Sequence, residues 1–111
     1  MAKPRVSQSA AVRVERLDGE IDIARVPALM QRFSSLNNEF ETLALDLSSV
    51  TFLDSSGIAL LHELSQRLRV RSQQLVVISP PGTMPRRVLD LTAFGTQVTL
   101  EDSVAAIDRQ P

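Results

Sequence analysis

The sequence predicts an α/β fold in which a mixed, mostly parallel sheet of four or five strands is covered by about four helices. Two observations predict this fold. Segments with the apolar patterns of strands alternate along the chain with segments of helical periodicity, which implies right-handed parallel crossovers. A chain of 111 residues also has room for only one core. We therefore expect one domain over residues 11–108, preceded at residues 1–10 by a flexible terminus or an edge strand.

The first half of the chain predicts two strands and a helix. Residues 11–17 alternate apolar and charged side chains with period two, which is typical of a strand with one buried face, and Asp18-Gly19 supplies a turn. A helix is expected over residues 24–36, and residues 42–46 read as a short buried strand. A strand at residues 5–9, paired as a hairpin with the first strand, would make the sheet mixed. The apolar residues that define the helix are Val26, Leu29, Met30, Phe33 and Leu36.

The second half predicts three more helices and two strands. A long helix begins at Asp54, and residues 74–79 form the most continuous apolar strand, which Pro80 and Pro81 stop. A helix over residues 85–91, with Val88 and Leu91 facing inward, is followed by a strand at 96–100. A closing helix then begins at Asp102-Ser103 and runs to Ile107. The inward face of the long helix consists of Ile58, Leu61, Leu64 and Leu68.

Composition excludes several classes of function. The 12 basic and 13 acidic residues nearly cancel, whereas proteins that bind nucleic acid by neutralising phosphates are usually strongly basic. The chain has no cysteine, and its single histidine, His62, excludes mechanisms that need two imidazoles. No apolar segment approaches the roughly 18 residues needed to span a bilayer, and the first ten residues lack the apolar core of a signal peptide. We therefore expect a cytoplasmic protein that contacts neither nucleic acid nor membrane directly.

The most informative segment is the beginning of the long helix. Asp54 is a good N-cap residue, and Ser55 falls in the first turn, near the carboxyl end of a strand, where open parallel sheets present ligand-facing groups. Gly57 costs about 1 kcal/mol relative to alanine inside a helix, so we expect another backbone or an anion to approach it closely. Asp-Ser-Ser also begins ordinary helices, and spacing alone leaves both readings open.

Three segments in this order resemble the STAS domain of bacterial anti-sigma factor antagonists. They are LDGEID at residues 17–22, LDL followed by FLDSSG at residues 45–57, and LDLTAF at residues 89–94. The resemblance covers nearly the whole chain, from Val12 to Ile107. It implies a non-enzymatic switch that has no cofactor of its own.

The resemblance also implies partners and site residues. The unphosphorylated protein would bind an anti-sigma factor that is itself a serine kinase of the histidine-kinase-like ATPase fold, and would thereby release the sigma factor. Phosphorylation of Ser55, or as second choice Ser56, would end this binding, and a PP2C-type phosphatase would reset it. Asp54 and Gly57 would hold the loop in shape. Asp22, Ser55 and Ser56 would lie on the partner-binding surface.

Three other functions remain open. Some STAS proteins with a similar loop are adaptor subunits of ABC lipid transporters or form stressosome cores, without being kinase substrates. A small-ligand sensor could use the helix N-terminus as an anion site. A serine hydrolase is disfavoured because Ser55 and His62 are separated by roughly 10 Å along the helix axis, and the chain lacks a G-x-S-x-G motif.

Overall fold

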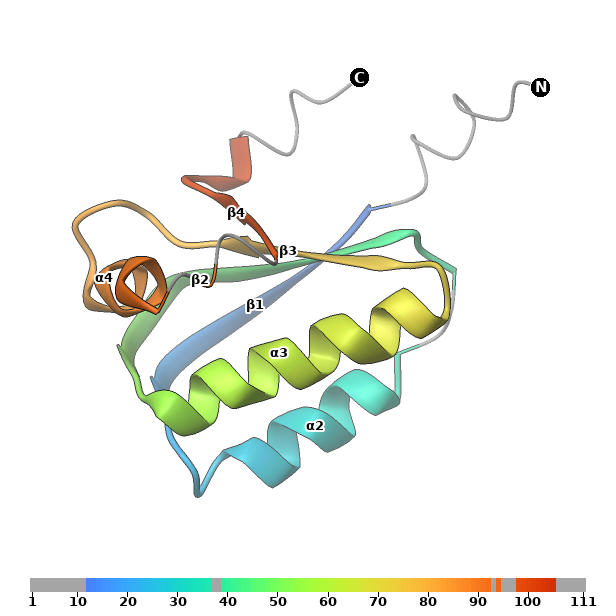
Figure 1. Cartoon of the computed structure of the whole chain (residues 1–111), viewed down its shortest axis with the longest axis horizontal. Coiled ribbons are helices and arrows are strands. Elements are labelled where there is room, and N and C mark those ends of the chain that lie inside the picture. The colour runs from blue at the N-terminus through green and yellow to red at the C-terminus, as the bar shows by residue number, and fades with distance from the viewer. Residues whose placement is uncertain (1–11, 37–38, 93, 95–97, 106–111) are drawn as a thin grey trace.

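Four parallel strands and three helices make up the computed structural model, which describes residues 12–36, 39–92, 94 and 98–105 (Figure 1). The strands pair in the order β1-β2-β3-β4, and every described pair is parallel. The predicted α/β class is therefore confirmed. The edge strand at residues 5–9, on which a mixed sheet depends, lies outside the described residues. The elements are β1 (Val12–Ile21), α2 (Val26–Ser34), β2 (Thr42–Leu53), α3 (Ser55–Val70), β3 (Gln74–Ile78), α4 (Met84–Leu91) and β4 (Thr99–Glu101).

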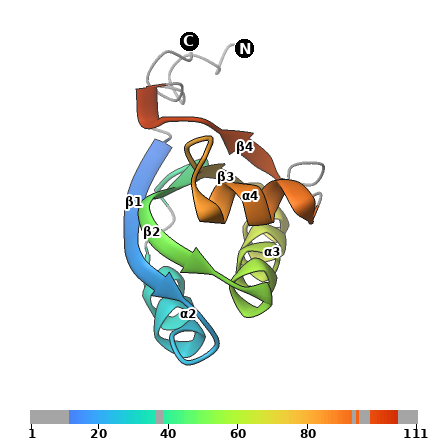
Figure 2. The same cartoon turned by 90° about the vertical axis from the view of Figure 1, so that its left-hand side faces the viewer.

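The helices lie to one side of this sheet. α2 and α3 run side by side along one face, and α4 packs against β2 near the end of the sheet where α3 begins (Figures 1 and 2). Sequential parallel strands joined by right-handed crossovers place their helices on the same face. The main core fills the space between this face and the helices, with fully buried side chains that include Leu17, Leu43, Leu45, Leu61 and Val77.

The opposite face of the sheet carries a second, smaller apolar cluster. Ala44, Val76 and Ile78 form it, and Val104 packs against them. Because successive side chains of a strand point to opposite faces, β2 and β3 are apolar on both sides. This explains why residues 75–78, within the predicted strand at 74–79, are all apolar.

The predicted turn at Asp18-Gly19 is wrong, because β1 continues through these residues to Ile21. Gly19 adopts a left-handed backbone (φ +71°), and the pairing of β1 with β2 shifts register on either side of the Asp18–Gly19 pair. The glycine therefore serves a bulge within a strand, not a reversal between strands. Glycine in this conformation supports either structure, so the local signal is ambiguous.

The strand predicted at residues 42–46 is too short, because β2 extends to Leu53. The Asp46 carboxylate accepts hydrogen bonds from the backbone N–H of Ser48 at 2.9 Å and from its hydroxyl at 2.5 Å. This local bonding keeps polar residues within an irregular strand, opposite the bulge in β1. β2 consequently carries the chain directly to the N-cap of α3.

The other differences concern the ends of elements and one inward-facing residue. Leu91, predicted to face inward, is 80% exposed, whereas Pro85 and Leu89 are buried. Residues four apart share a helix face, so the stripe that contains Pro85 and Leu89 leaves Leu91 on another side. α2 is shorter than the predicted helix at 24–36. β4 begins at Thr99, and residues 96–97 of the predicted strand at 96–100 lie outside the described residues. Of the predicted closing helix, the structure describes only Val104 and Ala105 in helical conformation, and the rest lies outside the described residues.

Candidate functional site

The candidate site lies where β2 ends and α3 begins. Asp54 has an extended backbone, and its Oδ1 accepts hydrogen bonds from the backbone N–H groups of Ser56 (3.0 Å) and Gly57 (3.2 Å). The Ser56 hydroxyl donates a third bond to the same oxygen at 2.6 Å. Asp54 thereby satisfies amide groups that have no acceptor within the helix. The turn is held in shape by its own residues.

These hydrogen bonds also determine the charge of the cap. The bond from the Ser56 hydroxyl is the main cause that lowers the pKa of Asp54 below its usual value. Desolvation raises this pKa, but the amides of Gly57 and Ser56 lower it further. A carboxyl group with a lowered pKa is fully ionised at neutral pH. The site therefore presents a fixed negative charge beside its serines.

The two serines of this turn differ in their surroundings. Ser56 is half-buried, and its hydroxyl is bonded to Asp54. Ser55 is exposed at the first helical position, and its hydroxyl makes none of the hydrogen bonds found among the described residues. An external enzyme can thus reach the Ser55 hydroxyl without breaking the cap, whereas a reaction at Ser56 would disrupt it.

Gly57 is where the start of α3 meets the end of β1. A Cβ atom at this position would lie 3.1 Å from Ile21 Cγ2 and 3.3 Å from the Ile21 carbonyl oxygen, and it would collide with Leu53 Cδ1. The side chains of Leu53 and Ile21 are both fully buried, so the surrounding atoms oppose their movement away from an added Cβ atom. The close neighbours of Gly57 are therefore residues of β1 and β2. Glycine allows α3 to begin in direct contact with the sheet.

The same contact brings Asp22 to the end of the sheet at which α3 begins. Ile21 and Leu53 are partners in the register of β1 and β2, so Asp22 and Asp54 directly follow the paired ends of two neighbouring strands. Adjacent strands in a sheet lie about 4.8 Å apart. Asp22 is half-buried, and the residue after it, Ile23, is 74% exposed. The structure thus brings together all the residues singled out from the sequence: Asp22, Asp54, Ser55, Ser56 and Gly57.

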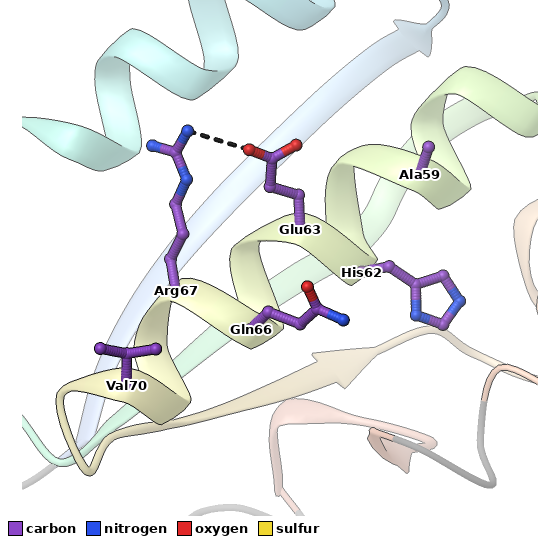
Figure 3. Close-up of a pocket in the computed structure, with 6 residues that line it drawn as sticks. All are labelled: Ala59, His62, Glu63, Gln66, Arg67 and Val70. Carbon is purple, nitrogen blue, oxygen red and sulfur yellow. Dashed lines mark hydrogen bonds and ion pairs between the residues drawn. The ribbon is translucent and has the colours of Figure 1, made fainter.

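A shallow pocket on α3 lies away from this turn (Figure 3). The Glu63–Arg67 ion pair (2.9 Å) borders it, and the His62 ring lies 4.8 Å from that of Phe94, centroid to centroid. His62 therefore has a packing role at the boundary of the core. The pocket is lined by Ala59, His62, Glu63, Gln66, Arg67 and Val70.

Two other features are absent from the part of the chain that the structure describes. It contains no cluster of three histidine, aspartate or glutamate side chains that could hold a metal ion. None of its helices is both long enough and apolar enough to cross a bilayer.

No sequence pattern singles out Arg25, which nonetheless contacts the end of β1. Its guanidinium donates hydrogen bonds to the carbonyl oxygens of Asp18 and Glu20. A lone arginine in a turn has no distinctive pattern, and only the neighbouring left-handed glycine offers a signal that extra support is needed there.

The family model for the STAS domain matches residues 3–107. The chain belongs to the STAS domain family. The resemblance noted from the sequence is thereby confirmed, and its most specific segment, residues 45–57, meets the segment at residues 17–22 at the site.

Two solved structures and one curated protein are similar to this chain. An anti-sigma factor antagonist from Mycobacterium paratuberculosis is 28% identical, with a TM-score of 0.76 over 87% of this chain and 82% of that one. Unphosphorylated SpoIIAA, an anti-sigma factor antagonist of Bacillus, shares the fold at 24% identity, with a TM-score of 0.70 over 90% and 88% of the two chains. A probable sulfate transporter from Arabidopsis thaliana is 37% identical over 46 residues, or 41% of this chain. The chain spans only 7% of that transporter's length.

Proposed function

We propose that this protein is an anti-sigma factor antagonist, controlled by phosphorylation of Ser55. In this proposal the unphosphorylated form binds an anti-sigma factor with a serine-kinase fold, which then releases its sigma factor. The protein catalyses no reaction and holds no cofactor. A PP2C-type phosphatase returns it to the binding form.

The observation that carries the proposal is the exposed Ser55 hydroxyl on a turn whose cap is held by the other serine, Ser56. Asp54 and Ser56 satisfy each other and the first amides of α3. A kinase can therefore modify Ser55 without competing with the hydrogen bonds that begin the helix. Two relatives in the comparison are named as anti-sigma factor antagonists, and SpoIIAA has structures in both its unphosphorylated and phosphorylated forms.

The physical effect of phosphate at Ser55 differs inside and outside the molecule. Phosphorylation adds a charge of about −1.5 to −2. The positive end of the α3 dipole stabilises such a charge by only about 0.3–1 kcal/mol, and the nearby carboxylates of Asp54 and Asp22 oppose this gain. We therefore expect the fold to remain nearly unchanged.

In a packed interface the same charge is far more costly. A buried charge without a partner destabilises a complex by roughly 3–5 kcal/mol, which corresponds to about two to four powers of ten in affinity. Asp22 and Asp54 already place negative charge at this surface, and the exposed Ile23 beside Asp22 offers an apolar contact. A surface that combines apolar contact with fixed negative charge suits a partner that contributes a cation opposite Asp22.

The matching segment in the sulfate transporter favours a second candidate, an adaptor domain in a transporter. In that case the Ser55 turn would be a fixed contact and not a substrate. Affinity purification of the tagged protein from its source cells discriminates the two. A soluble kinase of the ATPase fold supports the antagonist, whereas an ABC ATPase or a transporter subunit supports the adaptor.

Phosphorylation in vitro tests the proposal directly. The purified protein is incubated with ATP and each serine kinase of this class from the source organism, and the modified residue is located by mass spectrometry. We expect one phosphate at Ser55, unchanged stoichiometry in Ser56→Ala, and none in Ser55→Ala. Stoichiometric phosphorylation of Ser55→Ala would show that another residue is the acceptor.

A further inference from the structure

Arg25 links the turn before α2 to the last residues of β1. Its Nη1 donates to the carbonyl oxygen of Glu20 at 2.9 Å and to that of Asp18, and its Nη2 lies 3.5 Å from the Asp18 carboxylate. Its own backbone N–H donates to the Asp22 carbonyl at 3.0 Å. The side chain of Arg25 therefore holds β1 just before Asp22, and its backbone N–H binds Asp22 itself.

Stabilisation of the α2 N-terminus does not explain why an arginine occupies this position. Arg25 occupies the N-cap position of α2, where it provides no side-chain acceptor for the helix amides. A positive charge at a helix N-terminus is also disfavoured by the helix dipole. Serine, threonine, aspartate or asparagine would stabilise α2 better. The contacts of Arg25 with β1 give this residue its role.

The bulge in β1 explains why those contacts are needed. The register shifts around Asp18 and Gly19, and such a bulge interrupts the regular ladder of hydrogen bonds with the neighbouring strand. The planar guanidinium can bridge two carbonyl oxygens and a carboxylate in one fixed geometry. It thus fixes the segment that leads into Ile21 and Asp22, where β1 presses against Gly57.

We infer that Arg25 is the positioning residue of the partner-binding surface, because it holds Asp22 in place beside the Ser55 turn. This inference rests on the proposed function for its consequence, since Asp22 acts only if a partner binds there. The geometric part concerns the chain alone. Loss of the guanidinium should release Asp22 while the core and the cap of α3 remain intact.

Arg32 provides a matched control on the same two elements. Arg32 lies within α2, which Arg25 precedes as the N-cap residue, and it also donates to β1, through Glu15 Oε1 at 2.7 Å and the Arg16 carbonyl at 3.2 Å. These contacts lie in β1 before the bulge, farther from Asp22. Arg25→Gln and Arg32→Gln therefore remove the same charge from the same strand–helix pair at different distances from the site.

The first experiment needs no partner. Amide chemical shifts and hydrogen exchange are measured by NMR for the wild-type protein and both variants. In Arg25→Gln we expect shifts at Ile21, Asp22 and Gly57, and exchange over residues 19–22 that is faster by about tenfold. In Arg32→Gln we expect changes near Glu15 and Arg16 only. Unchanged signals at Asp22 and Gly57 in Arg25→Gln would overturn the inference.

The second experiment uses the serine kinase that phosphorylates the wild-type protein in vitro. We expect Arg25→Gln and Asp22→Asn each to weaken its binding by about tenfold, and the double variant to bind no more weakly than either. Arg25→Lys should bind more tightly than Arg25→Gln. Arg32→Gln and Asp22→Asn should act independently, so that the fold-changes in affinity of the two single variants multiply in the double variant. Multiplying effects of Arg25→Gln and Asp22→Asn would contradict the positioning role. If no such kinase binds the wild-type protein, the proposed function fails, and the NMR result still decides the geometric inference.

Discussion

The beginnings of α3 and α4 occupy equivalent places in the fold but are built differently. Each helix follows a parallel strand and starts near the same end of the sheet (Figures 1 and 2). At α4 the cap is Thr83, whose hydroxyl accepts from the Arg86 amide at 3.3 Å and donates to the Pro80 carbonyl at 2.8 Å. At α3 the cap is Asp54, and the exposed hydroxyl belongs to the residue after it.

Ion pairs extend this difference. The Arg86 side chain binds the Ser79 carbonyl (2.7 Å), Asp102 (2.8 Å) and Asp90 (3.2 Å), which ties the start of α4 to the end of β3 and to the chain beyond β4. Hydrogen bonds to Asp102 are the main cause that raises the pKa of Arg86. The start of α4 is thus occupied by internal contacts, whereas the start of α3 leaves the Ser55 hydroxyl exposed. The two helix starts therefore differ in whether a hydroxyl beside the cap is left free of internal hydrogen bonds among the described residues.

The largest expected effect is on partner binding at the α3 start. Ser55→Asp introduces one negative charge and should weaken binding to the anti-sigma factor by about 100-fold. Its melting temperature should stay within about 5 °C of the wild-type value. Calorimetric titration and thermal unfolding measure the two quantities. Ser55→Ala, as the uncharged control, should bind like the wild-type protein, and a collapsed fold in Ser55→Asp would mean that the turn is structural.

Gly57→Ala tests the close packing of the α3 start against the sheet. Helix propensity alone would make this change stabilising by about 1 kcal/mol. Overpacking against Leu53 and Ile21 usually costs about 1–3 kcal/mol, so we expect a lower free energy of unfolding. Urea denaturation measures the sign. Ala59→Gly, at an exposed position of the same helix, reports the propensity contribution alone, and a stabilised Gly57→Ala would refute the packing account.

Arg86→Gln tests the α4 start in the same way. The exposed carboxylates contribute little, so the bond to the Ser79 carbonyl should dominate a loss of about 1–2 kcal/mol in the free energy of unfolding. Phosphorylation of Ser55 and partner affinity should not change. A kinase assay and a denaturation curve on the same sample make the comparison. A large loss of phosphorylation in this variant would remove the distinction between the two helix starts.

The smallest effect concerns acid stability through Asp54. Because its pKa is lower in the folded protein than its usual value, its ionised form stabilises the fold above that value. This contribution is lost as the pH falls from about 5 toward 2. Asp54→Asn keeps a good cap without the charge, so its unfolding free energy should decline less over that range. An equal decline of the unfolding free energy in both proteins over that pH range would contradict the assigned role of the Ser56 hydroxyl.

The sequence predicted most of this architecture and identified the residues at the start of α3. Apolar periodicity located α3 and β3 well, because long helices and buried strands have strong patterns. The path of β1 could not be predicted, since Asp18-Gly19 has the composition of a turn and only pairing with β2 keeps it in a strand. Leu91 was misplaced because α4 is short and packs by one narrow stripe.

The details of the site depended on long-range contacts. The sequence favoured Ser55 over Ser56 by resemblance, but only coordinates show that Ser56 is bonded to the cap. The neighbour of Gly57 also required the structure, because Ile21 lies on another strand. Arg25 could not be identified from the sequence for the same reason, since its partners are backbone carbonyls, which leave no pattern in side-chain types.

The most direct test is a calorimetric titration of the anti-sigma factor with two forms of this protein, one carrying a phosphate on Ser55 and one without it. We expect the affinity of the phosphorylated form to be lower by at least about 100-fold, with matching circular dichroism spectra. Equal affinities for the two forms would contradict the claim that an exposed hydroxyl at the start of α3 controls association.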